Sequence, residues 1–175
     1  MTDYKARAKA IELVVFDVDG VLTDGSLFLG DDGQEYKAFN SRDGHGMAML
    51  RQAGIAMAVI TGRQSEVVRI RMESLGVEHI YQGQRDKRPA YDALRQVCGL
   101  EHAQIAYVGD DVVDLPVMRQ VGLAIAVADA HPLVKQYAHW QTRLPGGCGA
   151  AREVCEGLLE AQGKLEALFD GYASC

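Results

Sequence analysis

Four short apolar runs, each followed directly by polar residues, constrain the fold of this chain most. The runs are IELVVF at 11–16, IAMAVI at 55–60, IAYV at 105–108 and LAIAV at 123–127. Nearly continuous apolar character over so short a stretch is typical of strands that are covered on both faces. Amphipathic helical segments lie between the runs, and one of them places Val68, Met72 and Leu75 on a single face. We therefore expect an α/β fold in which helices flank a doubly wound, mostly parallel sheet of Rossmann-like topology.

Two stretches depart from this alternation. Residues 26–39 read SLFL, then GDDG, then QEYKAF, a pattern that predicts a β-hairpin with its turn at 30–33. The tail from about residue 145 to residue 175 runs through a Gly-rich turn into a helix with Ala150, Val154 and Leu158 on one face, and it is expected to fray towards Cys175. Because no repeat or linker interrupts the chain, we expect residues 1–175 to form a single domain.

Composition and charge argue against several classes of partner. The chain carries 18 Lys and Arg against 24 Asp and Glu, a net charge of −6, and it lacks a basic run. Such a chain is a poor ligand for nucleic acid or an anionic membrane. No apolar run approaches the ~20 residues that cross a bilayer, and no secretory signal is recognisable. The four cysteines contain no CxxC pair, so we expect reduced thiols in a cytoplasmic protein.

Acidic residues gather where the predicted strands end, which is the edge where open α/β sheets bind ligands. The acidic residues are Asp17, Asp19, Asp110 and Asp111, with Asp114 one helical turn later, and the polar Thr61 follows another predicted strand. Helix capping explains one or two such acids. Five converging carboxylates need a cation, because two like charges ~4 Å apart repel by roughly 4 kcal/mol at an effective dielectric of 20. An oxygen-only ligand set with room for water and phosphate predicts Mg²⁺.

The spacing of these residues favours phosphoryl transfer. The carboxylate of Asp17 can attack phosphorus, and Asp19 can protonate the leaving oxygen and later activate water. The Thr61 hydroxyl and nearby backbone N–H groups can donate to phosphate oxygens. Lys87 is the candidate for a fixed cation, although a lysine before a helix is often only a solvated charge.

Four segments in order, DVDGVLTDG, ITGR, DKRPA and GDDVVDLP, resemble the four motifs of the haloacid dehalogenase superfamily. The resemblance implies that Mg²⁺ is held by the Asp17 side chain, the Asp19 backbone carbonyl and Asp110, with Asp111 and Asp114 in supporting positions. A second Asp in the first motif is typical of the phosphotransferases of the superfamily. The intervals between motifs leave no space for a cap domain, so a neighbouring subunit is expected to cover the open site.

The segments LGDDGQEYKAFNSRDGHGMAMLRQAGI, TGRQSEVVRIRMESLGV and GGCGAAREVCEGLL resemble the family of 3-deoxy-D-manno-octulosonate 8-phosphate phosphatases. That resemblance implies a sugar acid phosphate substrate, a role in lipopolysaccharide synthesis, and a tetramer with packed hairpins. It also implies a Gly-rich tail that can reach a neighbour's site, although Cys148 departs from the family pattern there. The implied substrate-contacting residues are Asp19, Asn40, Ser41, Arg42, Asp43, Gly44, Ala48, Arg63, Arg71 and Lys87.

The residues themselves support part of this set. Arg71 has no acidic residue three or four positions away, and Arg63 follows a predicted strand end. Either guanidinium could therefore bind the substrate carboxylate. For Arg71 the alternative is a solvated charge on a helix. The loop at 40–44 could equally be a helix N-terminus without substrate contact. His45 is a weaker candidate for substrate contact. Truncation before Gly146 is expected to spare the chemistry on a small aryl phosphate.

Several alternatives stay open at this point. The substrate could be another sugar acid phosphate, such as a nine-carbon sialic-type acid. A receiver-like phospho-signalling module uses similar residues in a different order, and a catalytically silent subunit is a third alternative. Apolar residues on the hairpin predict a homo-oligomer, with a monomer whose hairpin folds back as the alternative; these residues are Leu27, Phe28, Leu29, Tyr36 and Phe39.

Overall fold

A six-stranded parallel sheet forms the centre of the computed structural model, which describes residues 4–173. The strands lie in the order β5-β4-β1-β6-β7-β8, and each neighbouring pair is parallel. Their bounds are β1 (Leu13–Phe16), β4 (Ala56–Ile60), β5 (His79–Tyr81), β6 (Ile105–Gly109), β7 (Leu123–Ala126) and β8 (Trp140–Gln141). The chain starts in the middle of the sheet and extends it first to one side and then to the other. The predicted doubly wound fold is therefore confirmed.

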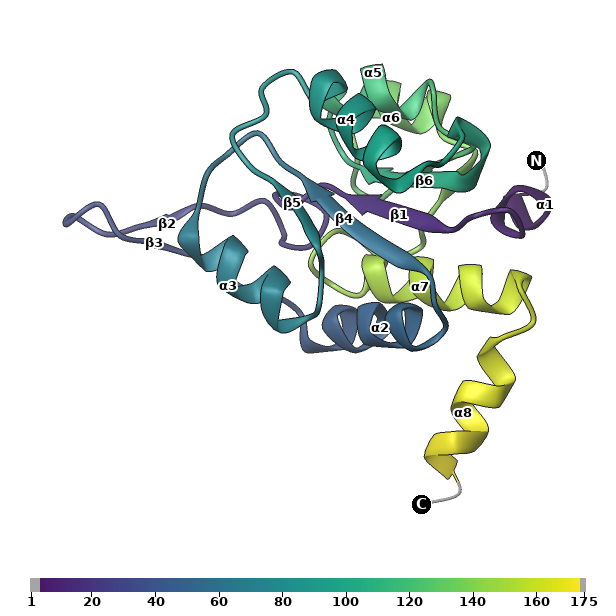
Figure 1. Ribbon diagram of the computed structural model, residues 1–175. Coiled ribbons are helices and arrows are strands. Elements are labelled where there is room, and N and C mark those ends of the chain that lie inside the picture. The colour runs from purple at the N-terminus through teal and green to yellow at the C-terminus, as the bar shows by residue number, and fades with distance from the viewer. Residues whose placement is uncertain (1–3, 174–175) are drawn as a thin grey trace.

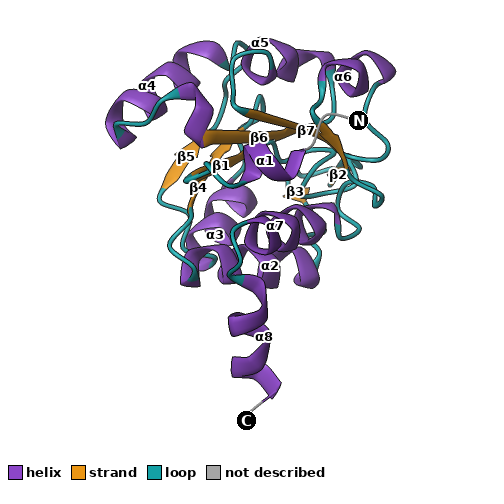
Figure 2. Ribbon diagram, turned by 90° about the vertical axis from the view of Figure 1, so that its right-hand side faces the viewer, coloured by secondary structure: helices purple, strands orange, loops and turns teal. Residues whose placement is uncertain are grey.

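Helices cover both faces of the sheet (Figure 2). One face carries α4 (Arg88–Cys98), α5 (Leu115–Met118) and α6 (Pro132–Tyr137), and the other carries α2 (Ser41–Gln52), α3 (Glu66–Ser74) and α7 (Ala150–Ala161). A short N-terminal helix, α1 (Tyr4–Ala8), packs against α7. Every residue of β1, β6 and β7 is buried, which explains why these strands read as continuous apolar runs.

The C-terminal part of the chain differs from the prediction in two ways. Trp140 and Gln141, for which no strand was predicted, pair with β7 as strand β8. Instead of fraying, the chain forms a further helix, α8 (Leu165–Ala173), which extends away from the sheet (Figures 1 and 2). The predicted apolar face of α7 is confirmed, because Ala150, Val154 and Leu158 are fully buried. Cys175 lies outside the described residues.

The predicted hairpin consists of β2 (Phe28–Leu29) and β3 (Glu35–Tyr36), and it projects from the sheet (Figure 1). It is shorter than expected because only two residue pairs form the ladder, and Lys37 then turns towards Asp19. The side chains of Leu27, Phe28, Leu29 and Tyr36 are largely exposed. Phe39 differs from the expectation, since it packs against the chain's own core.

Two further observations concern thiols and membranes. Within residues 4–173, Cys98, Cys148 and Cys155 are free thiols. In the same range, no helix combines the length and the apolar character that crossing a bilayer requires.

Candidate active site

The acidic residues expected to meet at the carboxyl edge of the sheet do meet there. Asp17 continues β1, and its backbone N–H donates to Val108 of β6 at 3.0 Å. Carboxylate oxygens of Asp17, Asp110 and Asp114 all lie within 4.8 Å of one another. The parallel pairing of β1 with β6 places the two strand ends side by side and so creates this cluster.

Lys87 is buried between two of these carboxylates. Its Nζ lies 3.0 Å from Asp17 and 2.6 Å from Asp114. Burial by itself lowers the pKa of Lys87, but the charges of Asp114 and Asp17 outweigh burial and raise that pKa above its usual value. The ammonium is therefore fixed next to the proposed nucleophile, which fits the role expected from the sequence.

Asp114 supports the site without a free oxygen of its own. Its Oδ1 accepts from Lys87 and from the Tyr107 hydroxyl at 2.7 Å. Its Oδ2 accepts from the backbone N–H groups of Asp110 at 3.0 Å and Asp111 at 3.2 Å. Asp114 thus shapes the turn that carries Asp110, consistent with the predicted supporting position. Asp111 is exposed, and its carboxylate caps the following 3₁₀ turn.

The cluster fits a divalent cation. Asp110 Oδ1 is buried and has no hydrogen-bond partner. Burial, together with the charges of Asp114 and then Asp17, raises the pKa of Asp110 to about 8. Burial and the Asp114 charge likewise raise the pKa of Asp17 to about 6, against the lowering effect of Lys87. Carboxylates that are costly to ionise and partly unpartnered are the donor set that a hard cation such as Mg²⁺ satisfies.

Close packing around Asp110 depends on a glycine. Gly20 follows Asp19 with φ of +89°, and a Cβ built there would overlap Asp110 Oδ2. Only glycine at position 20 therefore allows the loop after β1 to approach Asp110 this closely.

Asp19 lies in a ring of charged residues that the sequence did not reveal in full. Lys37 contacts Asp19 Oδ1 and lies 3.0 Å from Glu35. Arg63 lies 3.4 Å from Glu35 and 3.9 Å from Asp19 Oδ2. Lys37 was missed because nothing in QEYKAF distinguishes it from a solvated hairpin lysine; only the path of the chain after β3 places it at Asp19.

A second group of predicted residues lies together beside α2. Asn40, Gly44 and Arg71 line one small cavity. Any side chain at Gly44 would overlap the Arg71 guanidinium, so the two segments are in close contact. Arg71 Nε is buried without a hydrogen-bond partner. An unpartnered buried donor beside this loop supports the expectation that Arg71 meets an anion.

Other predicted residues occupy varied positions. Thr61 is buried at the end of β4, and Ala48 is half-buried on α2. Ser41 begins α2 and is exposed, as is Arg42, whose backbone N–H donates to the Asn40 side chain. The ring of His45 packs at 5.2 Å from that of Tyr172 in α8.

Asp43 has a structural role that the sequence did not suggest. Its buried carboxylate accepts from the backbone N–H groups of Arg152 at 2.8 Å and Gly149 at 3.3 Å. These donors belong to the N-terminus of α7, so Asp43 of α2 caps a helix distant in sequence. Both oxygens are thereby engaged within the chain.

The Gly-rich turn at 146–149 packs against the loop that follows β1 in the same chain. A Cβ at Gly146 would overlap the Gly20 carbonyl, and the Gly147 N–H donates to Val21 at 2.9 Å. The Asn40 side chain donates to the Gly147 carbonyl at 3.2 Å. The turn thus supports the site of its own chain, and α7 beyond it belongs to the core. Truncation before Gly146 would remove this turn and the buried residues of α7, so we now expect it to impair the fold and with it the chemistry on a small aryl phosphate.

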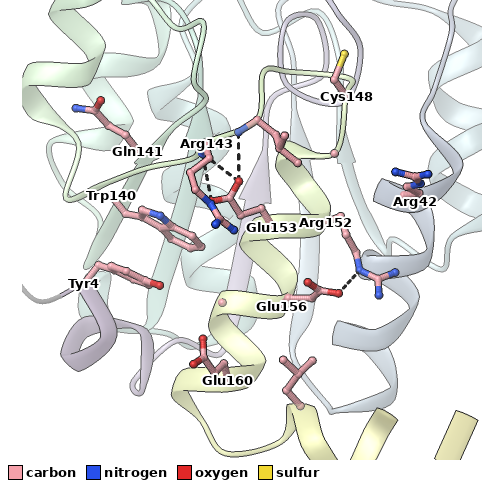
Figure 3. Close-up of a pocket in the computed structure, with 14 residues that line it drawn as sticks. Tyr4, Arg42, Trp140, Gln141, Arg143, Cys148, Arg152, Glu153, Glu156 and Glu160 are labelled. Atoms are coloured by element: carbon pink, nitrogen blue, oxygen red, sulfur yellow. Dashed lines mark hydrogen bonds and ion pairs between the residues drawn. The ribbon is translucent and has the colours of Figure 1, made fainter. Parts of the chain in front are cut away.

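A cavity of about 600 Å³ runs along α7 (Figure 3), and none of Asp17, Asp110 and Asp114 lines it. Arg42 lines it, together with the stacked rings of Tyr4 and Trp140. Glu153 and Glu156 in its wall are paired with Arg143 and Arg152 (Figure 3). Its charges are largely compensated internally, so it is not the candidate active site.

Comparisons with known proteins agree with this geometry. The family model of haloacid dehalogenase-like hydrolases matches residues 67–146. The 3-deoxy-D-manno-octulosonate 8-phosphate phosphatase of Yersinia pestis is 51% identical over 164 residues, which is 94% of this chain and 88% of the relative. The phosphatase of the same name from Escherichia coli strain K12 is 49% identical over 164 residues, covering 94% of this chain and 87% of the relative.

Solved structures show the same likeness. The crystal structure of the Yersinia pestis phosphatase has a TM-score of 0.91 at 51% identity, covering 93% of this chain and 88% of that one. The Moraxella catarrhalis phosphatase, solved in complex with a magnesium ion, a phosphate ion and the sugar acid KDO, has a TM-score of 0.96 at 41% identity, covering 98% and 99%. With this fold, these four motifs and this identity over nearly its whole length, the chain belongs to the 3-deoxy-D-manno-octulosonate 8-phosphate phosphatase family of haloacid dehalogenase-like hydrolases.

Proposed function

We propose that this chain is a Mg²⁺-dependent phosphomonoesterase that hydrolyses 3-deoxy-D-manno-octulosonate 8-phosphate to the free sugar acid and phosphate, in lipopolysaccharide biosynthesis. The observation that carries the proposal is the Asp17 carboxylate, buried against Lys87 and beside Asp110, in a chain 51% identical to a phosphatase of that name. The Moraxella catarrhalis relative, bound to the metal and both products, supports the same substrate.

The mechanism assigns a role to each group around phosphorus. An Asp17 oxygen attacks phosphorus, the P–O bond to the sugar breaks, and its electron pair leaves on the sugar oxygen, which takes a proton from Asp19. Asp19 then removes a proton from the water that attacks the aspartyl-phosphate, which releases phosphate and restores Asp17. Lys87 and the Thr61 hydroxyl hold phosphate oxygens. The Asp17 side chain, the Asp19 carbonyl and Asp110 would hold a Mg²⁺ ion, which when bound would neutralise charge on the phosphate.

The carboxylate end of the substrate requires cationic groups outside this centre. We assign Arg63 and Arg71 to that end, because Arg63 is partly exposed beside Asp19 and Arg71 keeps a buried donor without a partner. The remaining substrate-lining residues of the proposal are Asn40, Ser41, Arg42, Gly44 and Ala48. Asp43 is left out, because its oxygens cap α7.

The proposed biological unit is a homotetramer in which residues 1–175 of each chain form one domain. Four large apolar side chains of the hairpin are exposed, which is the supporting observation. Light scattering at micromolar concentration tests the assembly, and a monomer mass with full activity would contradict it. A cytoplasmic location is supported by the free thiols.

The proposed activity is tested by phosphate release from a panel of sugar acid phosphates, including a nine-carbon sialic-type acid, in Mg²⁺ and in excess chelator. We expect the highest kcat/KM with the eight-carbon substrate, and no release after metal is stripped. Higher kcat/KM with the nine-carbon substrate would change the proposed substrate, and full activity in chelator would contradict the mechanism. A receiver-like module would release no phosphate catalytically.

A further inference from the structure

Lys37 combines deep burial with direct contact to the proposed general acid. Its side chain is 1% exposed, touches Asp19 Oδ1, and lies 3.0 Å from Glu35. It follows β3 directly, so the hairpin delivers it to the active-site edge of the sheet. Burying an ammonium group costs free energy, and the two carboxylate partners offset that cost.

The contacts of Lys37 divide the two oxygens of Asp19 between different surroundings. Oδ1 faces the ammonium of Lys37, which can only donate hydrogen bonds. Oδ2 lies 3.9 Å from Arg63, whose side chain is 45% exposed, while that of Asp19 is 20% exposed. A small molecule can therefore reach Asp19 and Arg63, whereas Lys37 is covered.

We propose that Lys37 is a positioning residue for the acid–base step: by holding Oδ1 of Asp19, it leaves Oδ2 to exchange the proton with the leaving group. Because Oδ1 is occupied by the ammonium of Lys37, whereas Oδ2 lies towards Arg63 on the accessible side, the proton that Asp19 exchanges is assigned to Oδ2. As the P–O bond breaks, this proton moves to the sugar oxygen and its O–H electron pair stays on Oδ2. The inference rests on the proposed function, because it assigns Asp19 the role of general acid.

Glu35 completes the arrangement and explains how Lys37 is held. Its carboxylate lies 3.0 Å from Lys37 and 3.4 Å from Arg63. Burial raises the pKa of Glu35, but Lys37 and other donors outweigh it and keep that pKa below its usual value. The ammonium therefore lies between two carboxylates and cannot swing towards substrate without leaving both.

The test compares two leaving groups in a Lys37→Met variant. An alkyl oxygen such as that of the sugar needs a proton to depart, whereas p-nitrophenolate departs without one. General acid catalysis contributes ~10²–10⁴-fold, so we expect kcat/KM for the sugar acid phosphate to fall at least ~10-fold. With p-nitrophenyl phosphate we expect a fall below about threefold, and the inhibition constant of inorganic phosphate should stay within about twofold. Lys9→Met, at an exposed lysine, is the matched control and should change none of these values.

The outcomes separate the inference from the proposed function. Equal losses with both substrates, no loss with the sugar acid phosphate, or a weakened phosphate inhibition constant would each overturn the role of Lys37. If Lys37→Met unfolds, the double variant Lys37→Met/Glu35→Gln is used instead, because it removes the charge of Glu35 together with that of Lys37. It is judged by the same comparison of kcat/KM between the two substrates. Absence of Mg²⁺-dependent phosphate release by the unaltered enzyme would instead contradict the proposed function.

Discussion

Replacement of Asp43 by Ala removes the cap of α7 and tests whether this residue stabilises the fold or binds substrate. The variant loses two hydrogen bonds from backbone N–H groups to a carboxylate, at 2.8 and 3.3 Å. A charge-assisted bond contributes ~1.5–3 kcal/mol and an N-cap ~1 kcal/mol, while burial of the charge offsets part of this. Burial raises the pKa of Asp43, which reflects that cost. We expect a net loss of about 2–4 kcal/mol in the free energy of unfolding.

Thermal unfolding measures this loss directly. In a domain of this size, each kcal/mol of lost stability lowers Tm by about 2–4 °C, so Asp43→Ala should lower Tm by roughly 5–15 °C. Asp43→Asn keeps one acceptor oxygen, so its Tm should lie between those of the unaltered protein and Asp43→Ala. Asp92→Ala, at an exposed aspartate of α4, serves as control and should shift stability by less than ~0.5 kcal/mol. An unchanged Tm combined with a raised KM for the sugar acid phosphate would refute the capping role and favour substrate contact.

Three further predictions concern the metal cluster and the tail. The folded-state pKa is about 6 for Asp17 and about 8 for Asp110, and both exceed the unfolded values. The contribution of these two groups to stability is therefore fully present below about pH 4 and is lost as the pH rises through 6 and 8. Mg²⁺ binds the ionised forms, so the Tm gain over chelator should be larger at pH 8 than at pH 5.5; the reverse order in thermal scans would contradict this. Gly20→Ala should displace Asp110 and raise the Mg²⁺ concentration for half-maximal activity at least ~10-fold. The control Gly163→Ala also lies at a positive φ but has open space, so it should leave that concentration unchanged. Equal Mg²⁺ titrations of the two variants would contradict the overlap between a Cβ at position 20 and Asp110. Deletion of residues 145–175 should abolish folding because α7 fills the core, whereas deletion of 165–175 should retain activity on p-nitrophenyl phosphate; circular dichroism and turnover of both truncations decide this.

Local patterns were sufficient for the fold class and for the acidic part of the site. Continuous apolar runs identified β1, β4, β6 and β7, because strands covered on both faces have no polar face. The ends of those runs identified Asp17 and Asp110, since parallel strands expose their carboxyl ends at one edge. Lys87 could be suggested from its position, but its burial between two carboxylates is a tertiary fact.

Contacts between distant segments decided the rest. For Asp43 the family resemblance implied substrate contact, yet its oxygens cap a helix more than a hundred residues later. Lys37 had no signature, because a hairpin lysine is solvated unless the chain turns it inward. The Gly-rich turn was expected from the resemblance to reach a neighbour's site, but it is in close contact with the Gly20 loop of its own chain. The sequence alone thus determined the strands and the chemistry at their ends, which depend on short-range periodicity. The tertiary structure determined which charges meet and which helix each polar group caps, because these depend on how α2, α7 and the hairpin pack against the sheet.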